Sequence, residues 1–168
     1  GSRLDCCQRG AEIVRYGTKE RRSKLVDLGE RAGVCLCSGE LAAPQEVINK
    51  AVKAVYDLNV PLNLHANGDG AIDAFIKAHE VAAAGDLSKE RNVTMIHAQF
   101  TRKDQIDKYV QYKIRPSFYT LHTYYFAEAH IANRGREQAM HISPMRDAID
   151  AGLHPTNHTD AVVAPLDQ

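Results

Sequence analysis

The chain has 168 residues, enough for one domain with a sizeable core, because folding at this size buries roughly 70% of the unfolded surface. Its 21 basic and 21 acidic residues are mixed along the sequence, so no long-range field favours nucleic acid or an anionic membrane, and a small neutral substrate is expected. No apolar run approaches the roughly 20 residues that span a bilayer, and no signal-peptide pattern opens the chain, which predicts a cytoplasmic protein.

The first 38 residues differ in composition from the rest. They hold all the cysteines, in adjacent or alternate pairs that suit neither a disulfide framework nor a zinc knuckle, so free thiols are expected at Cys6, Cys7, Cys35 and Cys37. No histidine precedes His65. We predict one helix around Lys19–Leu28, and a boundary that separates residues 1–38 from a domain formed by residues 39–168.

From residue 40 onward, apolar runs alternate with helical patterns. Pro44 suits the first turn of a helix because its missing N–H costs nothing there, and apolar residues recur at helical spacing from Val47 to Tyr56. Three more helices are predicted, the last with Gly152 as its cap: Ala71–Ala84, Asp104–Tyr112 and Pro144–Ala151. Four short apolar runs predict strands: Val60–His65, Val93–His97, Ile114–Thr120 and Leu153–Asp160.

Polar side chains end three of these strands. Strands that alternate with helices predict βα units, an α/β fold and a parallel sheet, whose active site forms at the carboxyl ends of the strands. His65, His97 and Asp160 lie at such ends. Each of them alone is more often a satisfied polar or turn residue than a ligand, but two imidazoles and a carboxylate together are suited to Zn²⁺ or a similar first-row ion.

Further polar residues near these strand ends have two interpretations each. Asn67 and Asp69, in Asn-Gly-Asp-Gly, follow His65, and turn chemistry accounts for most of this motif; the alternative is that the glycines let the backbone approach a substrate. His122 and His158 are predicted to contact substrate or to support the metal ligands. The other four histidines are interpreted as surface residues: His79, His130, His141 and His154.

Three motifs carry a resemblance to a known family. They are Leu64–Asp73 (LHANGDGAID), Ile96–Gln99 (IHAQ) and Pro155–Asp160 (PTNHTD), the last followed by Val163 and Pro165. In this order and at these separations they resemble the amidohydrolase family 3 group of the amidohydrolase superfamily. The resemblance extends over about residues 39–168 and implies strands five to eight of a (β/α)₈ TIM barrel.

The resemblance also implies roles for the strand-end residues. His65 and His97 would bind a divalent metal, zinc or alternatively iron or manganese, and His122 would match the histidine after strand seven. Asp160 would bind metal, act as general base to the attacking water and later protonate the leaving nitrogen. A metal lowers the pKa of bound water toward about 7 and a nearby carboxylate moves the proton, so this assignment is chemically sound. The substrate implied is an amide, a cyclic amide or a substituted formamide.

The chain departs from the family pattern in several places. The strand-one His-x-His pair, a bridging Lys or Glu from strand four and the accompanying β-sandwich have no match in the sequence, and only eight residues follow Asp160. We therefore expect a partial barrel with an incomplete metal site, which can still hold a metal weakly.

An alternative hypothesis is a catalytically inactive half-barrel that self-associates. Two open sheet edges and a half-exposed apolar barrel interior would favour a homo-oligomer. Nucleic-acid binding has little support, because the sequence holds no basic patch with interleaved aromatic residues.

Overall fold

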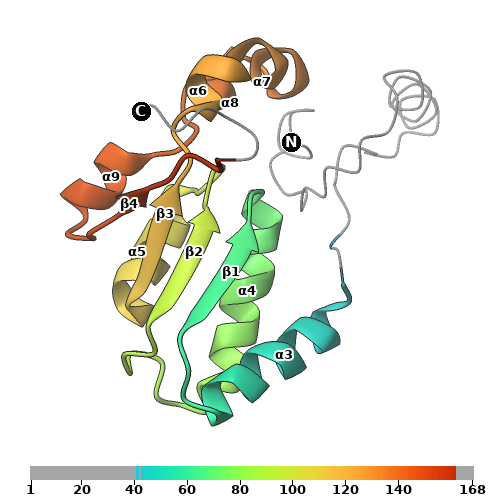
Figure 1. Ribbon diagram of the computed structural model, residues 1–168, viewed down its shortest axis with the longest axis vertical. Coiled ribbons are helices and arrows are strands. Elements are labelled where there is room, and N and C mark those ends of the chain that lie inside the picture. The colour runs from blue at the N-terminus through green and yellow to red at the C-terminus, as the bar shows by residue number, and fades with distance from the viewer. Residues whose placement is uncertain (1–40, 42, 162–168) are drawn as a thin grey trace.

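The computed structural model describes residues 41 and 43–161. Within them, four parallel strands form one sheet in the order β1-β2-β3-β4, so neighbours in the chain are neighbours in the sheet (Figure 1). The strands are β1 (Leu62–Ala66), β2 (Val93–His97), β3 (Ile114–Phe118) and β4 (Thr156–Asn157). Helices connect them, as the alternating pattern predicted, and the predicted α/β fold of parallel βα units is confirmed.

The helices that precede and join the strands lie close to their predicted positions. The structure has α3 (Gln45–Asp57), α4 (Asp69–Ala82), α5 (Lys103–Tyr112) and α9 (Met145–Asp150). Pro44 is the residue that precedes the first turn of α3, and Gly152 follows α9 with φ 85, a left-handed conformation that glycine adopts without steric cost. The predicted helix around Lys19–Leu28 and the boundary near residue 38 lie outside the described residues.

Three short helices between β3 and α9 were not predicted. They are α6 (His122–Tyr125), α7 (Ala127–Arg134) and α8 (Arg136–Ala139), and they cluster beyond the carboxyl ends of the strands (Figure 1). Their brevity explains the omission, since four to eight residues are too few to show a helical period. These helices matter because they lie over the edge of the sheet where the strand-end residues gather.

The core lies between the sheet and the helices α4 and α5. Paired positions of a parallel sheet share a face, and the register pairs Leu64 with Met95 and Met95 with Pro116. This face packs on α4 and α5, which contribute large buried side chains such as Phe75 and Tyr109. At roughly 1.5–3 kcal/mol for each fully buried large side chain, this core holds the strand ends in place.

The opposite face of the sheet is more polar than expected. It carries Asn63, Thr94 and Arg115, of which Asn63 and Arg115 are exposed. Among the described strand residues, Ile96 is the large apolar side chain on this face. The expectation of an apolar, half-exposed barrel interior is therefore not met on this face. Self-association remains a prediction that rests on the free edge of β1 within the described sheet.

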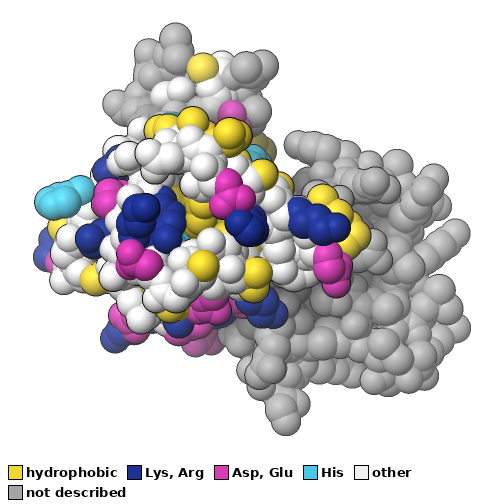
Figure 2. All heavy atoms as spheres, turned by 90° about the horizontal axis from the view of Figure 1, so that it is seen from below, with side chains coloured by type: hydrophobic (Ala, Val, Ile, Leu, Met, Phe, Trp, Pro, Cys, Tyr) yellow, Lys and Arg dark blue, Asp and Glu magenta, His cyan; other side chains and the backbone are white. Residues whose placement is uncertain are grey.

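The outer surface mixes charges of both signs. Seen from the amino ends of the strands, basic and acidic side chains alternate with small apolar areas (Figure 2). This agrees with the balanced composition of 21 basic and 21 acidic residues. Among the described residues, no helix combines the length and the apolar character needed to cross a membrane.

His79 is buried, although the sequence suggested a surface position. Its side chain is 0% exposed on α4, its Nδ1 accepts from the Tyr56 hydroxyl at 2.7 Å, and its Nε2 lies 3.0 Å from the Leu87 carbonyl oxygen. The ring also stacks on Tyr112, with centroids 4.7 Å apart. Both nitrogens are thus satisfied by a neutral ring, and this explains how a polar side chain is tolerated in the core.

We expect the burial of His79 to make the fold acid-sensitive. Burial lowers its pKa from 6.5, so below that pH the unfolded chain binds a proton that the folded chain excludes. The free energy of unfolding therefore falls as the pH drops below about 6.5. Urea titrations at pH 7.5 and 5.5 should show a smaller pH-dependent loss in His79→Gln than in the control His154→Gln, whose residue is exposed. Equal losses in both variants would contradict this.

Candidate functional site

His65 and His97 meet at the carboxyl ends of neighbouring strands. Their rings lie edge to face with centroids 4.5 Å apart. His97 is buried, whereas His65 is exposed at the end of β1. The two imidazoles are 32 positions apart in the chain, and the parallel pairing of β1 with β2 brings them together, as the strand-end argument predicted.

This contact depends on an unusual backbone at the end of β2. Strict alternation would place His97 on the helix-covered face with Met95, because it pairs with Ala66 and not with His65. His97 and Ala98 instead have φ 69 and φ 46, left-handed values that cost a non-glycine residue about 1–2 kcal/mol each. The alternation of the strand therefore stops at His97, and its ring reaches His65. Such strain concentrates at functional sites.

The fourth strand is shorter than predicted, and its two polar residues lie beyond it. β4 contains only Thr156 and Asn157, so the prediction of an extended strand through Asp160 is wrong. The His158 N–H donates to the Phe118 carbonyl at 3.0 Å, which holds this segment against the end of β3. Asp160 has φ 51 and does not continue an extended chain, so the expected shared face of His158 and Asp160 has no structural basis.

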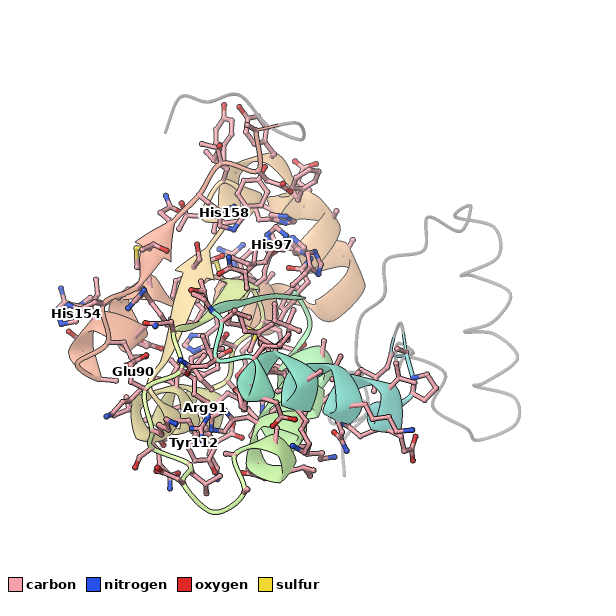
Figure 3. All side chains as sticks on the ribbon, turned by 60° about the horizontal axis from the view of Figure 1, so that its bottom comes forward. Glu90, Arg91, His97, Tyr112, His154 and His158 are labelled. Atoms are coloured by element: carbon pink, nitrogen blue, oxygen red, sulfur yellow. The ribbon has the colours of Figure 1, made fainter. Side chains whose placement is uncertain are left out.

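His158 and Asp160 nevertheless lie in the same neighbourhood as the first two histidines. The His158 ring centroid is 4.8 Å from that of His97, and its plane is tilted by 51° (Figure 3). The negative charge of Asp160 acts on His97, His158 and His122. The carboxyl ends of β1, β2 and the β4 segment thus supply three imidazoles and one carboxylate to one region.

A second pair of imidazoles continues the cluster toward the unpredicted helices. His122 lies edge to face with Tyr119, with ring centroids 4.5 Å apart, and its Nδ1 is 3.2 Å from the Nε2 of His130 on α7. His130 in turn packs against Phe100. His130 is half-buried, so its interpretation as an ordinary surface residue is met only in part, whereas His141 and His154 are exposed as expected.

Burial keeps the inner histidines neutral. It lowers the pKa of His97 to about 4, with the positive charges of His65 and His158 adding to the effect and Asp160 opposing it. Burial also lowers the pKa of His122 to about 4, assisted by His130. Burial is also the largest cause of the lowered pKa of His158. At neutral pH these rings hold lone pairs, the form that binds metals.

Asn67 and Asp69 lie in the loop and helix start that follow β1. The Asn67 carbonyl accepts from the Phe100 N–H at 3.1 Å, and this bond joins the loops after β1 and β2. Its side-chain Oδ1 is buried and has no hydrogen-bond partner among the described residues. An amide oxygen in that state is suited to a donor from a ligand or an ordered water.

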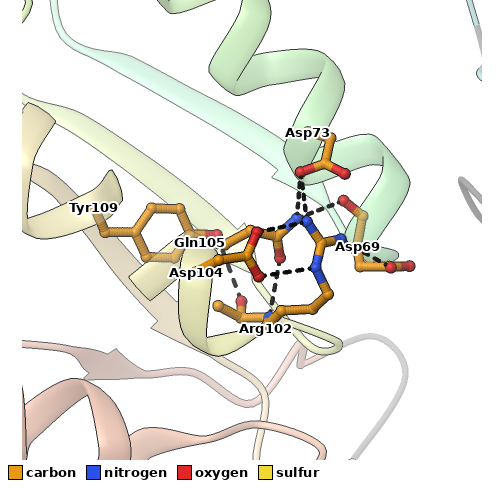
Figure 4. A network of polar contacts seen from close by, with 7 residues as sticks. Asp69, Asp73, Arg102, Asp104, Gln105 and Tyr109 are labelled. Atoms are coloured by element: carbon orange, nitrogen blue, oxygen red, sulfur yellow. Dashed lines mark hydrogen bonds and ion pairs between the residues drawn. The ribbon is translucent and has the colours of Figure 1, made fainter. Parts of the chain in front are cut away.

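Asp69 belongs to a polar network around Arg102, which comes directly after the β2 loop (Figure 4). Its carboxylate is 4% exposed and lies 3.0 Å from the Arg102 guanidinium, which also binds Asp73 and Asp104 at 2.9 Å. Gln105 donates to the Asp69 carbonyl at 2.8 Å. Burial lowers the pKa of Arg102, but its hydrogen bonds to Asp104 and Asp73 outweigh burial and raise it overall. The observed contacts of Asp69 are thus structural.

The donor set fits a divalent cation in the kind of ligand it offers. Nδ1 of His97 and Nε2 of His158 are buried and lack hydrogen-bond partners among the described residues, an arrangement that costs free energy unless a ligand satisfies them. Among the described residues, no group of three or more His, Cys, Asp or Glu side chains is already arranged to hold a metal ion. Metal binding would therefore require side-chain rotation, for which the exposed His65 has room.

Several residues of this region escaped the sequence argument. Tyr119 stacks on His158 with centroids 5.5 Å apart, and its buried hydroxyl has no partner among the described residues. Tyr124 and Tyr125 are 78% and 48% exposed, so they are not core residues. Tyr119 ends an apolar run and carries no polar signal, so only its position one residue after β3 could have indicated it.

Comparison with known proteins supplies a family and a fold. The model of a family described as the amidohydrolase family matches residues 20–168. Among solved structures, the chain is similar to an uncharacterized metal-dependent hydrolase from Pyrococcus furiosus, with a TM-score of 0.64 and 23% identity. The similarity covers 98% of this chain and 35% of that one, so the chain spans about a third of that protein's length. No curated protein matches the chain.

Proposed function

The chain belongs to the amidohydrolase family, and from this premise we propose that it forms part of a metal-dependent hydrolase acting on carbon–nitrogen bonds of small non-peptide amides. The observation that supports the proposal most directly is the contact between His65 and His97, whose rings meet at 4.5 Å where two parallel strands end. The balanced charge of the chain agrees with a small neutral substrate.

We assign the metal to His65, His97 and Asp160, with zinc as the first choice and iron or manganese as alternatives. A bound divalent metal would supply a Lewis acid that polarises the scissile carbonyl and lowers the pKa of water toward about 7. The Nδ1 atom of the buried His97 supports this assignment. Burial favours the neutral ring, and Nδ1 has no hydrogen-bond partner among the described residues.

Asp160 is assigned the proton transfers. Its carboxylate takes a proton from the attacking water and returns it to the leaving nitrogen, a role that requires a group placed within reach of both. The charge of Asp160 acts on His97 and His122, where it opposes the lowering of the pKa by burial, and this supports the assignment. His122, His158, Asn67 and Asp69 remain the predicted substrate contacts. Asn67 has a buried, unpartnered amide oxygen, whereas the Asp69 carboxylate is engaged by Arg102.

The four βα units are proposed to be the second half of an eight-unit barrel, in which the first strand would complete the metal site. The 35% coverage of the similar hydrolase supports this assignment, since four units and their connections are less than half of such a protein. Self-association through the edge of β1 that is unpaired within the described sheet is the accompanying proposal, and sedimentation of a dispersed monomer would contradict it.

The proposal is tested by metal content and by turnover together. Purified protein dialysed against zinc, iron or manganese is expected to retain about one ion per chain more tightly than the double variant His65→Gln/His97→Gln. A panel of amides and esters should then show metal-dependent hydrolysis that favours amides. No retained metal and no hydrolysis after reconstitution would overturn the proposal. Faster hydrolysis of esters would overturn the carbon–nitrogen assignment alone.

A further inference from the structure

We propose that His158 is a third imidazole ligand of the metal, which would place it on the ion itself instead of on the substrate. The inference rests on the proposed function, because it concerns the same ion. It starts from the state of the two ring nitrogens of His158, which differ in a way that is typical of metal ligands.

One nitrogen of His158 is held and the other is free. The side chain forms a hydrogen bond with the Ser117 backbone, and that bond favours the ring carrying a proton there. Nε2 is buried and has no partner among the described residues, so the bond to Ser117 involves Nδ1. A histidine that binds a metal usually donates its other N–H to a backbone carbonyl or a carboxylate, which fixes the tautomer and leaves the ligating lone pair free. His158 meets this description without any metal being assumed.

The ring of His158 lies close to the imidazoles that are assigned to the metal. The centroid of the His158 ring lies 4.8 Å from that of His97, which lies 4.5 Å from that of His65. Two imidazoles on one tetrahedral zinc ion, bound at about 2.0–2.1 Å, have ring centres about 5 Å apart. The spacings of His65 and His158 from His97 are therefore both near that value. The three rings are not yet arranged to hold an ion, and the exposed His65 side chain has room to rotate toward the other two.

The positions of His158 and His97 are fixed by their surroundings. The backbone N–H of His158 donates to the Phe118 carbonyl at 3.0 Å, and its ring stacks on the buried Tyr119 with an interplanar angle of 27°. His97 is buried and held by its left-handed backbone. Two of the three imidazoles are thus preorganised, which reduces the ordering cost of binding.

His65, His97 and His158 supply three imidazole nitrogens, the donor set of an open zinc site with a fourth position for water. Asp160, two residues after His158, is then available for proton transfer and need not act mainly as a ligand.

The experiment measures Co²⁺ and Zn²⁺ binding to the full chain and needs no substrate. Co²⁺ reports coordination through its visible absorption, which is strong for four-coordinate ions and weak for six-coordinate ones, and Zn²⁺ affinity follows from competition with a chelator. The variants are His158→Gln and the matched control His154→Gln, which replaces an exposed histidine four residues earlier. Circular dichroism and urea unfolding check that each variant folds.

The proposal expects His158→Gln to weaken Zn²⁺ binding by more than about 100-fold, above the range for loss of a supporting residue, and to abolish the strong Co²⁺ absorption. His154→Gln should bind as the unaltered chain does. Unchanged affinity and absorption in a folded His158→Gln would overturn the proposal and leave the proposed function standing. If the unaltered chain binds neither ion, the metal assignment of the proposed function fails as well. If His158→Gln does not fold, His158→Asn, which can keep the bond to Ser117 without a ligating ring nitrogen, replaces it with the same two outcomes.

Discussion

Replacement of Arg102 by Met is expected to lower the free energy of unfolding by about 3 kcal/mol, among the larger effects of any single substitution in the chain. The guanidinium lies 3.0 Å from Asp69, whose carboxylate is 4% exposed, and it joins this carboxylate to Asp73 and Asp104. Without Arg102, the buried carboxylate of Asp69 loses its ion pair with the guanidinium and lies close to the negative charges of Asp73 and Asp104. Urea unfolding at pH 7.5 measures the change.

Two further variants separate this charge effect from loss of packing. Asp69→Asn in the Arg102→Met background should recover part of the stability, because it removes a buried negative charge that has lost its ion pair with Arg102. Arg146→Met serves as the control, because Arg146 pairs with Asp150 on an exposed helix surface and its loss should change little. Equal effects of Arg102→Met and Arg146→Met would contradict the structural role assigned to the network.

Asp160→Asn is expected to lower the rate of amide hydrolysis by the metal-loaded protein by about 10²–10⁴-fold. A carboxamide cannot take a proton from water or return one to the leaving nitrogen. Most of the bound metal should remain if His65, His97 and His158 supply the principal ligands. The measurement is kcat with the best amide found in the substrate panel, together with metal content.

The matched control is Asp147→Asn, an exposed carboxylate on α9 that contacts His141. Its kcat should equal that of the unaltered chain. An Asp160→Asn protein that turns over at the same rate as Asp147→Asn would refute the assignment of proton transfer to Asp160. A comparable loss of kcat together with complete loss of metal would instead make Asp160 a principal ligand and favour the family's pattern over the three-imidazole site.

The strands and their connecting helices could be predicted because their signals are strong. Val93–His97 is a run of buried or half-buried, mostly β-branched or large apolar residues, and its predicted and observed bounds coincide. Where the fourth strand was predicted to reach Asp160, pairing stops at Asn157, because β3 offers partners only up to Phe118. Strand length is decided by the neighbouring strand, and one sequence segment does not contain that information.

The candidate site was partly predictable for a similar reason. The gathering of His65 and His97 follows from parallel pairing, which the alternating pattern indicates. The left-handed turn at His97 does not follow from it, since alternation alone would send that ring to the other face. The contact of His130 with His122 was missed because it depends on short helices without a clear period. Burial of His79 was missed because its partners, Tyr56 and Leu87, come from other segments.

The most direct test of the metal site is diffraction from crystals of the full chain grown with zinc, recorded on both sides of the zinc absorption edge. An anomalous peak is predicted about 2.0–2.2 Å from ring nitrogens of His65 and His97, with Asp160 beside it. A zinc ion bound elsewhere in fully loaded crystals, with the rings of His65 and His97 turned away from each other, would contradict it.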